Sequence, residues 1–267
     1  PLDMRYLTHA ASPPPVPWSS PVAPSTSHSG AAVRDLTHTY HGISQHVKPI
    51  TDISSLLTDD EFTASLQANK IWASDIAAKD PEFFKNSAKG QAPDILWIGC
   101  CDSRVPETTV LGKKPGEVFV LRNIANIINP TDIALLSSVE FSVKHLKIKH
   151  IVLCGHTSCG GVKATLANNK LDILDVWLQP MRQIREKHSE ALSKLTGEEK
   201  EDALARLNIQ QGVENLRRIP TVVDAIKNRG LKIHGLLYKL SDGHLEQIDT
   251  AEDEVASECR HNTFELK

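Results

Sequence analysis

The chain has 267 residues, of which 40% are hydrophobic and 24% are charged, enough of both for an ordinary globular core. Its 30 basic and 33 acidic residues give a formal net charge of −3, which excludes the basic footprint of a general nucleic-acid binder. No apolar run approaches the roughly 18 residues that span a bilayer, and five cysteines in so long a chain exclude a disulfide-stapled miniprotein. We therefore expect a soluble domain of enzyme size without nucleic-acid or membrane partners.

Residues 1–34 form a segment of unusual composition. They hold seven prolines, and their only acidic residue is Asp3. Such a stretch cannot bury enough apolar surface to offset the entropy of ordering it. A Ser-rich, acid-poor composition is also typical of an organellar transit peptide. We expect a disordered leader, either a targeting signal that favours a mitochondrial location or an ordinary tail of a cytoplasmic protein.

The first predicted element after the leader is a helix over residues 59–78. Acidic residues stand at its start, and apolar residues recur near one face. These apolar residues are Phe62, Leu66, Trp72 and Ile76. We expect the segment to form an N-terminal helical arm.

Three short apolar runs follow, over residues 95–98, 118–121 and 151–153. Uninterrupted runs of this length suit strands that are buried on both faces of a parallel sheet. Between the second and third runs, Pro130 is expected at the first position of a helix, with Asp132 in its first turn. The apolar stripe of that helix consists of Leu135, Leu136, Val139, Val143 and Leu146.

The rest of the chain continues the alternation of helices and strands. Residues 172–229 are predicted to be mostly helical, with a charged break at 196–200. Residues 232–240, 241–243 and 245–248 then suit a strand, a tight turn and a returning strand.

Strands that alternate with helices predict an α/β domain with a largely parallel central sheet flanked by helices. We expect this domain to cover residues 35–250, arm included, and a polar C-terminal tail to follow over residues 251–267. Sheets of this kind bind ligands beyond the carboxyl ends of their strands. The chemistry is therefore expected just after the first and third strands.

Cysteine, histidine and charged residues gather at these two strand ends. They are Cys100, Cys101, Asp102 and Arg104 after the first strand and Cys154, His156 and Cys159 after the third. Cys and His are the usual zinc ligands, and the short spacing of His156 and Cys159 lets one loop present two of them. A third ligand is expected from the other loop, so the two loops together predict a metal site.

The cysteines are not equivalent. Adjacent residues of an extended chain point in opposite directions, so Cys100 and Cys101 are not expected to bind one metal together. Cys154 lies within a strand run and is expected to face the packed interior. A free cysteine behaves as a small buried hydrophobe, which is the default expectation for Cys101 and Cys154. Cys259 lies in the polar tail and shows no partner in the sequence.

Two spaced motifs stand out, Cys100-x-Asp102-x-Arg104 and His156-x-x-Cys159-Gly160-Gly161. Together they resemble the signature of the β-class carbonic anhydrases. Shorter similar phrases are Pro115-Gly116-Glu117, Arg122-Asn123-Ile124-Ala125-Asn126 and Ile233-His234-Gly235. The resemblance implies one Zn²⁺ per chain, held by Cys100, His156 and Cys159, and reversible hydration of CO2 to bicarbonate and a proton.

Three protein ligands leave a fourth position on tetrahedral zinc, which is typical of a catalytic site. A water in that position loses its proton near neutral pH and attacks CO2 as hydroxide. Because two thiolates cancel the charge of Zn²⁺, we expect a less acidic water than in an all-histidine site. The rate should then rise through pH 7 and above.

By resemblance, Asp102 and Arg104 form the functional dyad of the family. An aspartate two residues from a zinc thiolate can accept a hydrogen bond from the bound water, or it can occupy the fourth position itself. Arg104 offers a bidentate fork to that carboxylate, and the partner that Asp102 takes decides whether the zinc is open. The alternative from the residues alone is an ordinary surface ion pair.

Further residues are expected around the metal. Gln91, Phe119 and Phe141 match positions that line the CO2 pocket in related enzymes, some of them across a subunit boundary. On pattern alone, Phe119 and Phe141 are core residues. The backbone amides of Gly160 and Gly161 either hold bicarbonate or serve a tight strand–helix turn.

Trp97, Arg122 and Tyr238 match a trio that binds a regulatory bicarbonate in a subset of the family. Such a ligand must bind the closed, Asp-ligated state better than the open one. Each residue also has a plain interpretation. Trp97 suits a strand core, Arg122 a structural hydrogen-bond donor and Tyr238 a half-buried strand position.

The resemblance also implies a homodimer or homotetramer in which residues 36–78 wrap an adjacent subunit. Packing of the same helix on its own domain would give the same sequence pattern.

The main rival function is that of a non-catalytic zinc protein in which Cys101 or Cys154 completes a closed Cys₃His site. A nucleotide-binding protein is disfavoured because residues 155–161 lack the Gly-Lys-Ser/Thr of a phosphate loop. A dithiol redox role is disfavoured because the redox pattern is Cys-x-x-Cys. Within the same fold, CS2 is an alternative substrate to CO2.

Overall fold

The computed structural model describes residues 60–266. The leader predicted over residues 1–34, and the rest of the chain up to residue 59, lie outside the described residues. The chain divides into two units between Gln67 and Ala68. Within the described part, no helix combines the length and the apolar character that crossing a membrane requires.

Helix α1 (Glu61–Lys79) confirms the helix predicted over residues 59–78. Asp60 stands at its start and accepts hydrogen bonds from the backbone N–H groups of Phe62 and Thr63 at 3.2 and 3.1 Å. None of its residues is buried. Its exposed large apolar side chains are Phe62, Leu66, Ile71 and Trp72.

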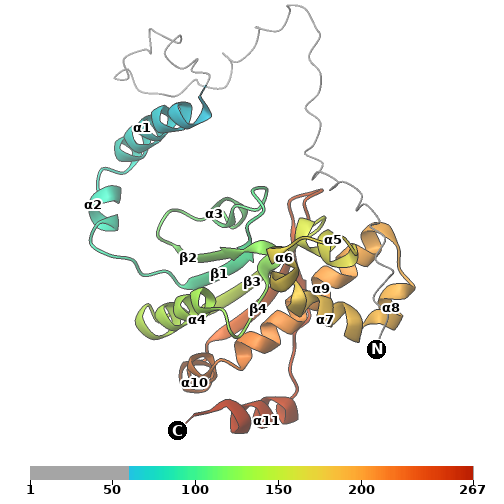
Figure 1. The fold of residues 1–267 in the computed structure, drawn as a ribbon. Helices are drawn as coiled ribbons and strands as arrows, with labels where there is room; N and C mark the ends of the chain where they lie inside the picture. The colour runs from blue at the N-terminus through green and yellow to red at the C-terminus, as the bar shows by residue number, and fades with distance from the viewer. Residues whose placement is uncertain (1–59, 267) are drawn as a thin grey trace, which may run out of the picture. The chain divides into compact units, whose positions relative to one another are not determined.

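Five strands form one sheet in the order β2-β1-β3-β4-β5 (Figure 1). They are β1 (Ile95–Cys100), β2 (Val118–Asn123), β3 (His150–His156), β4 (Lys232–Tyr238) and β5 (Leu245–Ile248). The first four are parallel, and β5 pairs with β4 in the antiparallel direction. The largely parallel sheet and the final hairpin are therefore confirmed, and β1 and β3 end side by side.

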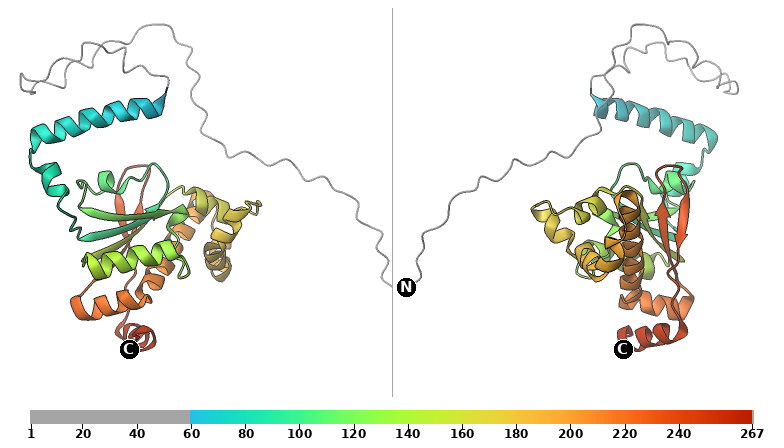
Figure 2. Two further views of the ribbon diagram at one scale, coloured as in Figure 1. Left: turned by 60° about the vertical axis from the view of Figure 1, so that its left-hand side comes forward. Right: turned by 90° about the vertical axis from the view of Figure 1, so that its right-hand side faces the viewer.

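Helices cover one face of the sheet (Figure 2). They are α4 (Ile133–Glu140), which continues into the π-helical turn η3 (Phe141–His145), α9 (Gly197–Arg217) and α10 (Pro220–Arg229). The main core lies between these helices and the strands and includes Leu96, Ile98, Leu153, Ile209 and Val213. Burial of this apolar surface is the principal source of the domain's stability.

A smaller apolar cluster lies on the opposite face of the sheet. Its buried members are Trp97, Val105, Val152 and Cys154. Val110 of the short helix α3 (Glu107–Val110) packs against them. Both faces of β1 and β3 are thus buried, as their uninterrupted apolar runs predict.

Six further helices are described. They are α2 (Phe83–Ser87), α5 (Gly160–Leu166), α6 (Ile173–Trp177), α7 (Gln179–Lys187), α8 (Ser189–Ser193) and α11 (Glu254–Phe264). The mostly helical stretch expected over 172–229 is confirmed. The polar tail contains a helix, α11, which the sequence analysis did not anticipate.

Two predicted boundaries were wrong. Pro130 does not take the first helical position, because Asp132 caps α4 by accepting from the N–H groups of Ala134 and Leu135 at 2.9 and 3.4 Å. The charged break at 196–200 is also shorter than predicted, because α9 begins at Gly197. Acidic residues in a first turn complement the helix dipole, so they start this helix and do not interrupt one.

Candidate metal centre

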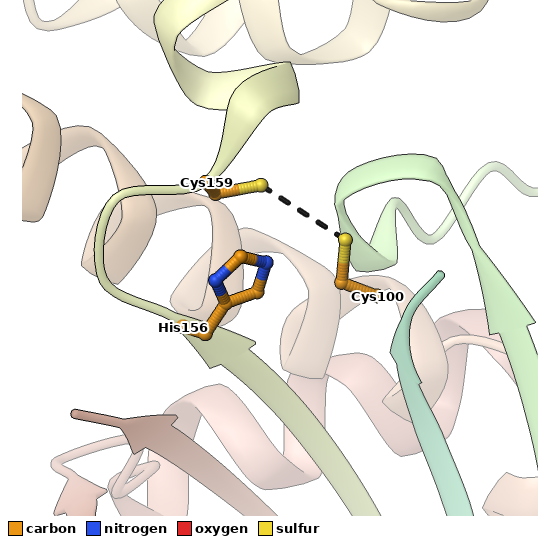
Figure 3. A group of neighbouring side chains, drawn as sticks. All are labelled: Cys100, His156 and Cys159. Atoms are coloured by element: carbon orange, nitrogen blue, oxygen red, sulfur yellow. Dashed lines mark hydrogen bonds between the residues drawn. The ribbon is translucent and has the colours of Figure 1, made fainter. Parts of the chain in front are cut away.

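Three buried side chains converge beyond the ends of β1 and β3 (Figure 3). Cys100 is the last residue of β1, His156 is the last residue of β3, and Cys159 caps the start of α5. One ligand atom from each lies within 4.8 Å of the other two. The two sulfur atoms are 4.0 Å apart. The structure therefore brings together the three residues expected to bind the metal.

The imidazole of His156 is set to offer a lone pair to this group. Its Nδ1 lies 2.9 Å from the carbonyl oxygen of Thr157, which can only accept, so Nδ1 carries the proton. Its Nε2 is buried and has no hydrogen-bond partner among the described residues. A buried acceptor without a partner is costly in a packed interior, and a metal ion satisfies it.

The two thiols influence each other's protonation. A hydrogen bond from the Cys159 thiol holds the pKa of Cys100 below its usual range, against the opposing effect of burial. The same hydrogen bond, together with burial, raises the pKa of Cys159. The pair therefore favours one thiolate and one shared proton, which a bound metal ion would displace.

The other cysteines do not join the group. Cys154 lies in the smaller cluster on the opposite face, its sulfur is 3.2 Å from the carbonyl oxygen of Gly155, and burial raises its pKa to about 12. Cys101 is exposed, so the expectation that it is buried was wrong. It lies one residue beyond the end of β1, whereas Cys100 is buried, so the two cysteines do not share one environment. Among the described residues the group thus has three donors, not the four of a closed Cys₃His site.

Asp102 lies beside the group and is held by Arg104. The guanidinium donates from Nε to Oδ1 at 2.9 Å and from Nη2 to Oδ2 at 2.7 Å, and the backbone N–H of Arg104 also donates to Oδ1. These bonds, the side-chain ones first, lower the pKa of Asp102 to about 2. Asp102 Oδ2 is 3.7 Å from His156 Nε2. The pair therefore faces the donor group and is not an isolated surface ion pair.

Arg122 ties the loop after β1 to β2. Its Nε donates to the carbonyl oxygen of Cys100 at 2.9 Å, and its Nη2 donates to that of Asp102 at 2.5 Å. Its Nη1 lies 3.9 Å from Glu107 Oε2. These contacts match the plain interpretation of Arg122 as a structural donor.

Trp97 and Tyr238 pack in the same apolar cluster, and the strand register places Arg122 on the same face of the sheet. Trp97 is fully buried, and its Nε1 has no hydrogen-bond partner among the described residues. The indole lies against Gly99, where an added Cβ would collide with Nε1.

The expected pocket residues do not reach the donor group within one chain. Gln91 lies in an exposed loop before β1, at the opposite end of that strand from Cys100. Phe119 pairs with Leu96, four residues before Cys100 and so about 13 Å away along the strand. The rings of Phe119 and Phe141 lie 5.8 Å apart, and Phe141 is 44% exposed.

Close packing explains why residue 161 is a glycine. An added Cβ would lie 2.7 Å from the Cβ of Ala125, so the turn from Cys159 into α5 needs glycine there. The backbone N–H groups of Val162 and Gly161 interact with the Cys159 sulfur. Packing against Ala125 therefore accounts for Gly161 within α5, and the bicarbonate contact of Gly160 and Gly161 stays a prediction.

Sequence reasoning missed the segment Ala125–Asn126, which packs next to the donor group in a left-handed backbone conformation. Asn126 is a residue type that adopts this conformation readily, but Ala125 gave no signal of it.

Comparisons with known proteins agree with this geometry. Residues 95–245 match the family model described as carbonic anhydrase. A carbonic anhydrase of Emericella nidulans is 38% identical over 185 residues, which cover 68% of this chain and 81% of the relative. A carbonic anhydrase of Saccharomyces cerevisiae is 36% identical over 212 residues, which cover 75% of this chain and 96% of the relative.

Solved structures agree as well. The β-carbonic anhydrase CafA of Aspergillus fumigatus is 48% identical, with a TM-score of 0.77 over 78% of this chain and all of the relative. A tetrameric β-carbonic anhydrase of Sordaria macrospora is 46% identical, with a TM-score of 0.69 over 70% of this chain and 96% of the relative. This chain therefore belongs to the β-carbonic anhydrase family.

Proposed function

We propose that this chain catalyses the reversible hydration of CO2 to bicarbonate and a proton, using one zinc ion held by Cys100, His156 and Cys159. The observation that supports it most is the convergence of three buried donors beyond two parallel strands in a chain of this family. Two thiols and an imidazole form a donor set suited to zinc. When bound, the zinc ion lowers the pKa of a water toward neutrality and so supplies a hydroxide nucleophile.

Asp102 orients the reaction. Its carboxylate borders the space that His156 Nε2 faces, at 3.7 Å. From there it accepts a hydrogen bond from the attacking oxygen and leaves a lone pair of that oxygen turned toward CO2. Arg104 fixes the carboxylate in this position through two parallel hydrogen bonds. If Asp102 left Arg104, its carboxylate would be a further donor beside Cys100, His156 and Cys159, and the site would close.

The test is stopped-flow CO2 hydration against pH, with zinc stoichiometry measured on the same sample. We expect about one zinc per chain and a rate that rises through pH 7, because two thiolates reduce the acidity of the water. Cys100→Ser should abolish both zinc and rate. Cys101→Ser, a change at the adjacent exposed cysteine, should leave both unchanged. Full zinc occupancy without hydration would make the zinc structural, and hydrolysis of CS2 in place of CO2 would redirect the substrate.

We propose further that the active form is a homodimer or homotetramer and that Gln91, Phe119 and Phe141 line the pocket of an adjacent subunit. Their distance from Cys100 within one chain supports this arrangement. The apolar side chains of Val120 and Phe141, exposed at the edge strand β2 and next to it, give the partner a surface to cover. The Sordaria macrospora relatives are tetrameric. Light scattering coupled to size-exclusion chromatography measures the state, and a monomer with full activity would contradict the proposal.

A regulatory bicarbonate at Trp97, Arg122 and Tyr238 is a second proposal for the same enzyme. A buried indole N–H without a partner is a ready donor to an anion, and such a ligand must favour the closed state in order to inhibit. Trp97→Phe removes the N–H and leaves the contacts of Arg122 with the Cys100 loop in place. Added bicarbonate should then inhibit hydration less in Trp97→Phe than in the wild type. Equal inhibition of the two proteins would contradict the proposal.

For location we propose the mitochondrion, with the cytoplasm as the alternative. The composition of residues 1–34 supports this location. A relative from Arabidopsis thaliana that is 33% identical also carries the word mitochondrial in its name. We also propose residues 35–250 as the enzyme domain and residues 251–267 as its polar C-terminal tail, whose helix α11 contacts the domain through Arg260 and the carbonyl oxygen of Arg217. Fusion of residues 1–59 to a fluorescent protein tests the location, and a diffuse cytoplasmic signal would favour the alternative.

A further inference from the structure

The turn η2 (Ile124–Asn126), directly after β2, has an unusual backbone. Ala125 and Asn126 both adopt left-handed conformations, with φ values of 62° and 46°. Both are buried, at 0% and 3% exposure. Asparagine tolerates this region, but alanine adopts it at a cost because its Cβ crowds the following carbonyl oxygen. A buried alanine at such a position points to a role for its methyl group.

This corner contacts each of the three segments that hold the donor group. The carbonyl oxygen of Asn123, at its start, accepts from the backbone N–H of Cys101 at 2.9 Å, one residue after Cys100. Asn126 Oδ1 lies 3.4 Å from the position of a Cβ on Gly155, one residue before His156.

The third contact reaches the Cys159 segment. The Cβ of Ala125 lies 2.7 Å from the position of a Cβ on Gly161, two residues after Cys159. The methyl group of Ala125 and the bare backbone of Gly161 therefore fit each other closely, and neither an added nor a missing methyl group would preserve the spacing.

The corner is itself held firmly. The Asn123 side chain donates to the carbonyl oxygen of Ile127 and accepts from its N–H, both at 2.9 Å. Asn208, buried on α9, donates from Nδ2 to the carbonyl oxygen of Ala125 at 3.0 Å. A left-handed pair that is fixed on both sides can transmit a defined spacing to its neighbours.

We propose that Ala125 and Asn126 are positioning residues of the zinc site. Ala125 acts as a spacer that sets the distance between the strand ends carrying Cys100 and His156 and the α5 turn carrying Cys159. The inference rests on the proposed zinc site. It adds that the turn η2 holds the three ligand atoms at the spacing that lets them converge. Residues that orient ligands from outside the coordination sphere commonly change metal affinity by about 10- to 100-fold.

The decisive test is a pair of compensating variants. Gly161→Ala adds a methyl group against Ala125, and we expect zinc affinity, measured by competition with a chelator, to fall about tenfold or more. The absorption spectrum of the Co²⁺-substituted protein should change with it, because the ligand geometry changes. In the double variant Ala125→Gly/Gly161→Ala, the methyl group is moved across the same contact, and affinity and spectrum should return toward those of the wild type.

A second variant keeps the test decisive if Gly161→Ala does not fold. Ala125→Gly relieves the left-handed backbone, but it also frees the unfolded chain and removes a buried methyl group, so we expect a loss of thermal stability without metal. We expect zinc affinity to fall in this variant, whereas the control variant described below loses stability without losing zinc affinity. If the corner served stability alone, zinc affinity would fall only to the extent that thermal stability falls.

Leu231→Ala is the control. Leu231 is buried just before β4, at the amino end of the sheet and so away from the three ligand segments, and its truncation leaves a cavity there. It should lower thermal stability and leave zinc affinity and the Co²⁺ spectrum unchanged. Wild-type affinity and spectrum in Gly161→Ala, or a double variant no better than the single one, would overturn the positioning role. Failure of the wild type to bind one zinc would instead overturn the proposed function, so the two failures are distinguishable.

Discussion

Arg104 engages both oxygens of the Asp102 carboxylate, at 2.9 and 2.7 Å. Lysine keeps the charge but cannot form two parallel hydrogen bonds from a planar fork. We expect Arg104→Lys to retain zinc and to lower kcat/KM for CO2 on the order of tenfold or more, since a misplacement of about 1 Å can cost roughly a hundredfold. Stopped-flow hydration with parallel zinc analysis checks this. An unchanged kcat/KM would mean that Arg104 does not orient Asp102.

The donors themselves could be predicted residue by residue, but their supports could not. Alternation along a strand predicts that Cys100 and Cys101 do not bind one metal together, and among the described residues only Cys100 joins the donor group. Cys101 is exposed because the loop after β1 lies at the surface of the fold. The position of a loop relative to the surface depends on tertiary packing, which the sequence pattern does not reveal. The left-handed Ala125 has no sequence signal because alanine does not favour that conformation. Only the packing against Gly161 accounts for it.

At the scale of elements, α4 is fixed by its cap. Asp132 Oδ1 accepts from the backbone N–H groups of Ala134 and Leu135. Asp132→Ala should lower the free energy of unfolding by about 1 kcal/mol, within the usual 0.5–2 kcal/mol for N-caps. Asp132→Asn, which retains an acceptor, should cost much less. Urea denaturation followed by circular dichroism measures both, and equal losses in the two variants would contradict the capping role.

A pH dependence of stability is expected where β3 and β4 begin. His150 Nδ1 and His234 Nε2 are 3.1 Å apart. Burial first, then the charges of His150 and Lys232, lowers the pKa of His234 below its usual 6.5. The unfolded chain therefore takes up the proton at a higher pH than the folded chain. The stabilising contribution is complete above about pH 6.5 and is lost as the pH falls below that value.

Urea unfolding between pH 8 and 5.5 tests this expectation. His234→Gln should flatten the decline in the free energy of unfolding relative to the wild type. His244→Gln removes a histidine that is 82% exposed and should leave the decline unchanged. Acid release of zinc affects all three proteins alike, so the differences between them report His234. A decline of equal slope in His234→Gln would contradict the argument.

The strands were easier to predict than the helix boundaries. An uninterrupted apolar run requires burial on both faces, and β1, β2 and β3 all begin where or next to where those runs begin. A helix start depends on which of several nearby residues satisfies its free N–H groups. The sequence predicts Pro130 at the first helical position and Asp132 in the first turn, but the hydrogen bonds that Asp132 accepts make it the cap and set the boundary. Local competition of this kind is not visible in composition or periodicity.

At the scale of the whole molecule, the sheet separates two sets of residues. The donor group lies at the carboxyl ends of β1 and β3, whereas Gln91 precedes β1 and Phe119 lies near the start of β2. A rigid parallel sheet cannot bring these ends together within one chain. The motifs themselves carry no information about which subunit they serve, and only the resemblance to the family implied that some pocket residues act across a subunit boundary. An active pocket built from both sets requires a second copy of the chain.

Subunit complementation tests that requirement. Cys100→Ser removes a zinc ligand, and Gln91→Ala should lower the hydration rate at least about tenfold through loss of substrate positioning. When the two variants are co-expressed with different affinity tags and isolated through both, a mixed dimer has one site with an intact zinc group and an intact partner pocket. Mixed oligomers should therefore regain up to about half of the wild-type rate. If Gln91 instead acts within its own chain, every site in the mixture carries one defect, and the mixed oligomers would be no faster than the Gln91→Ala protein.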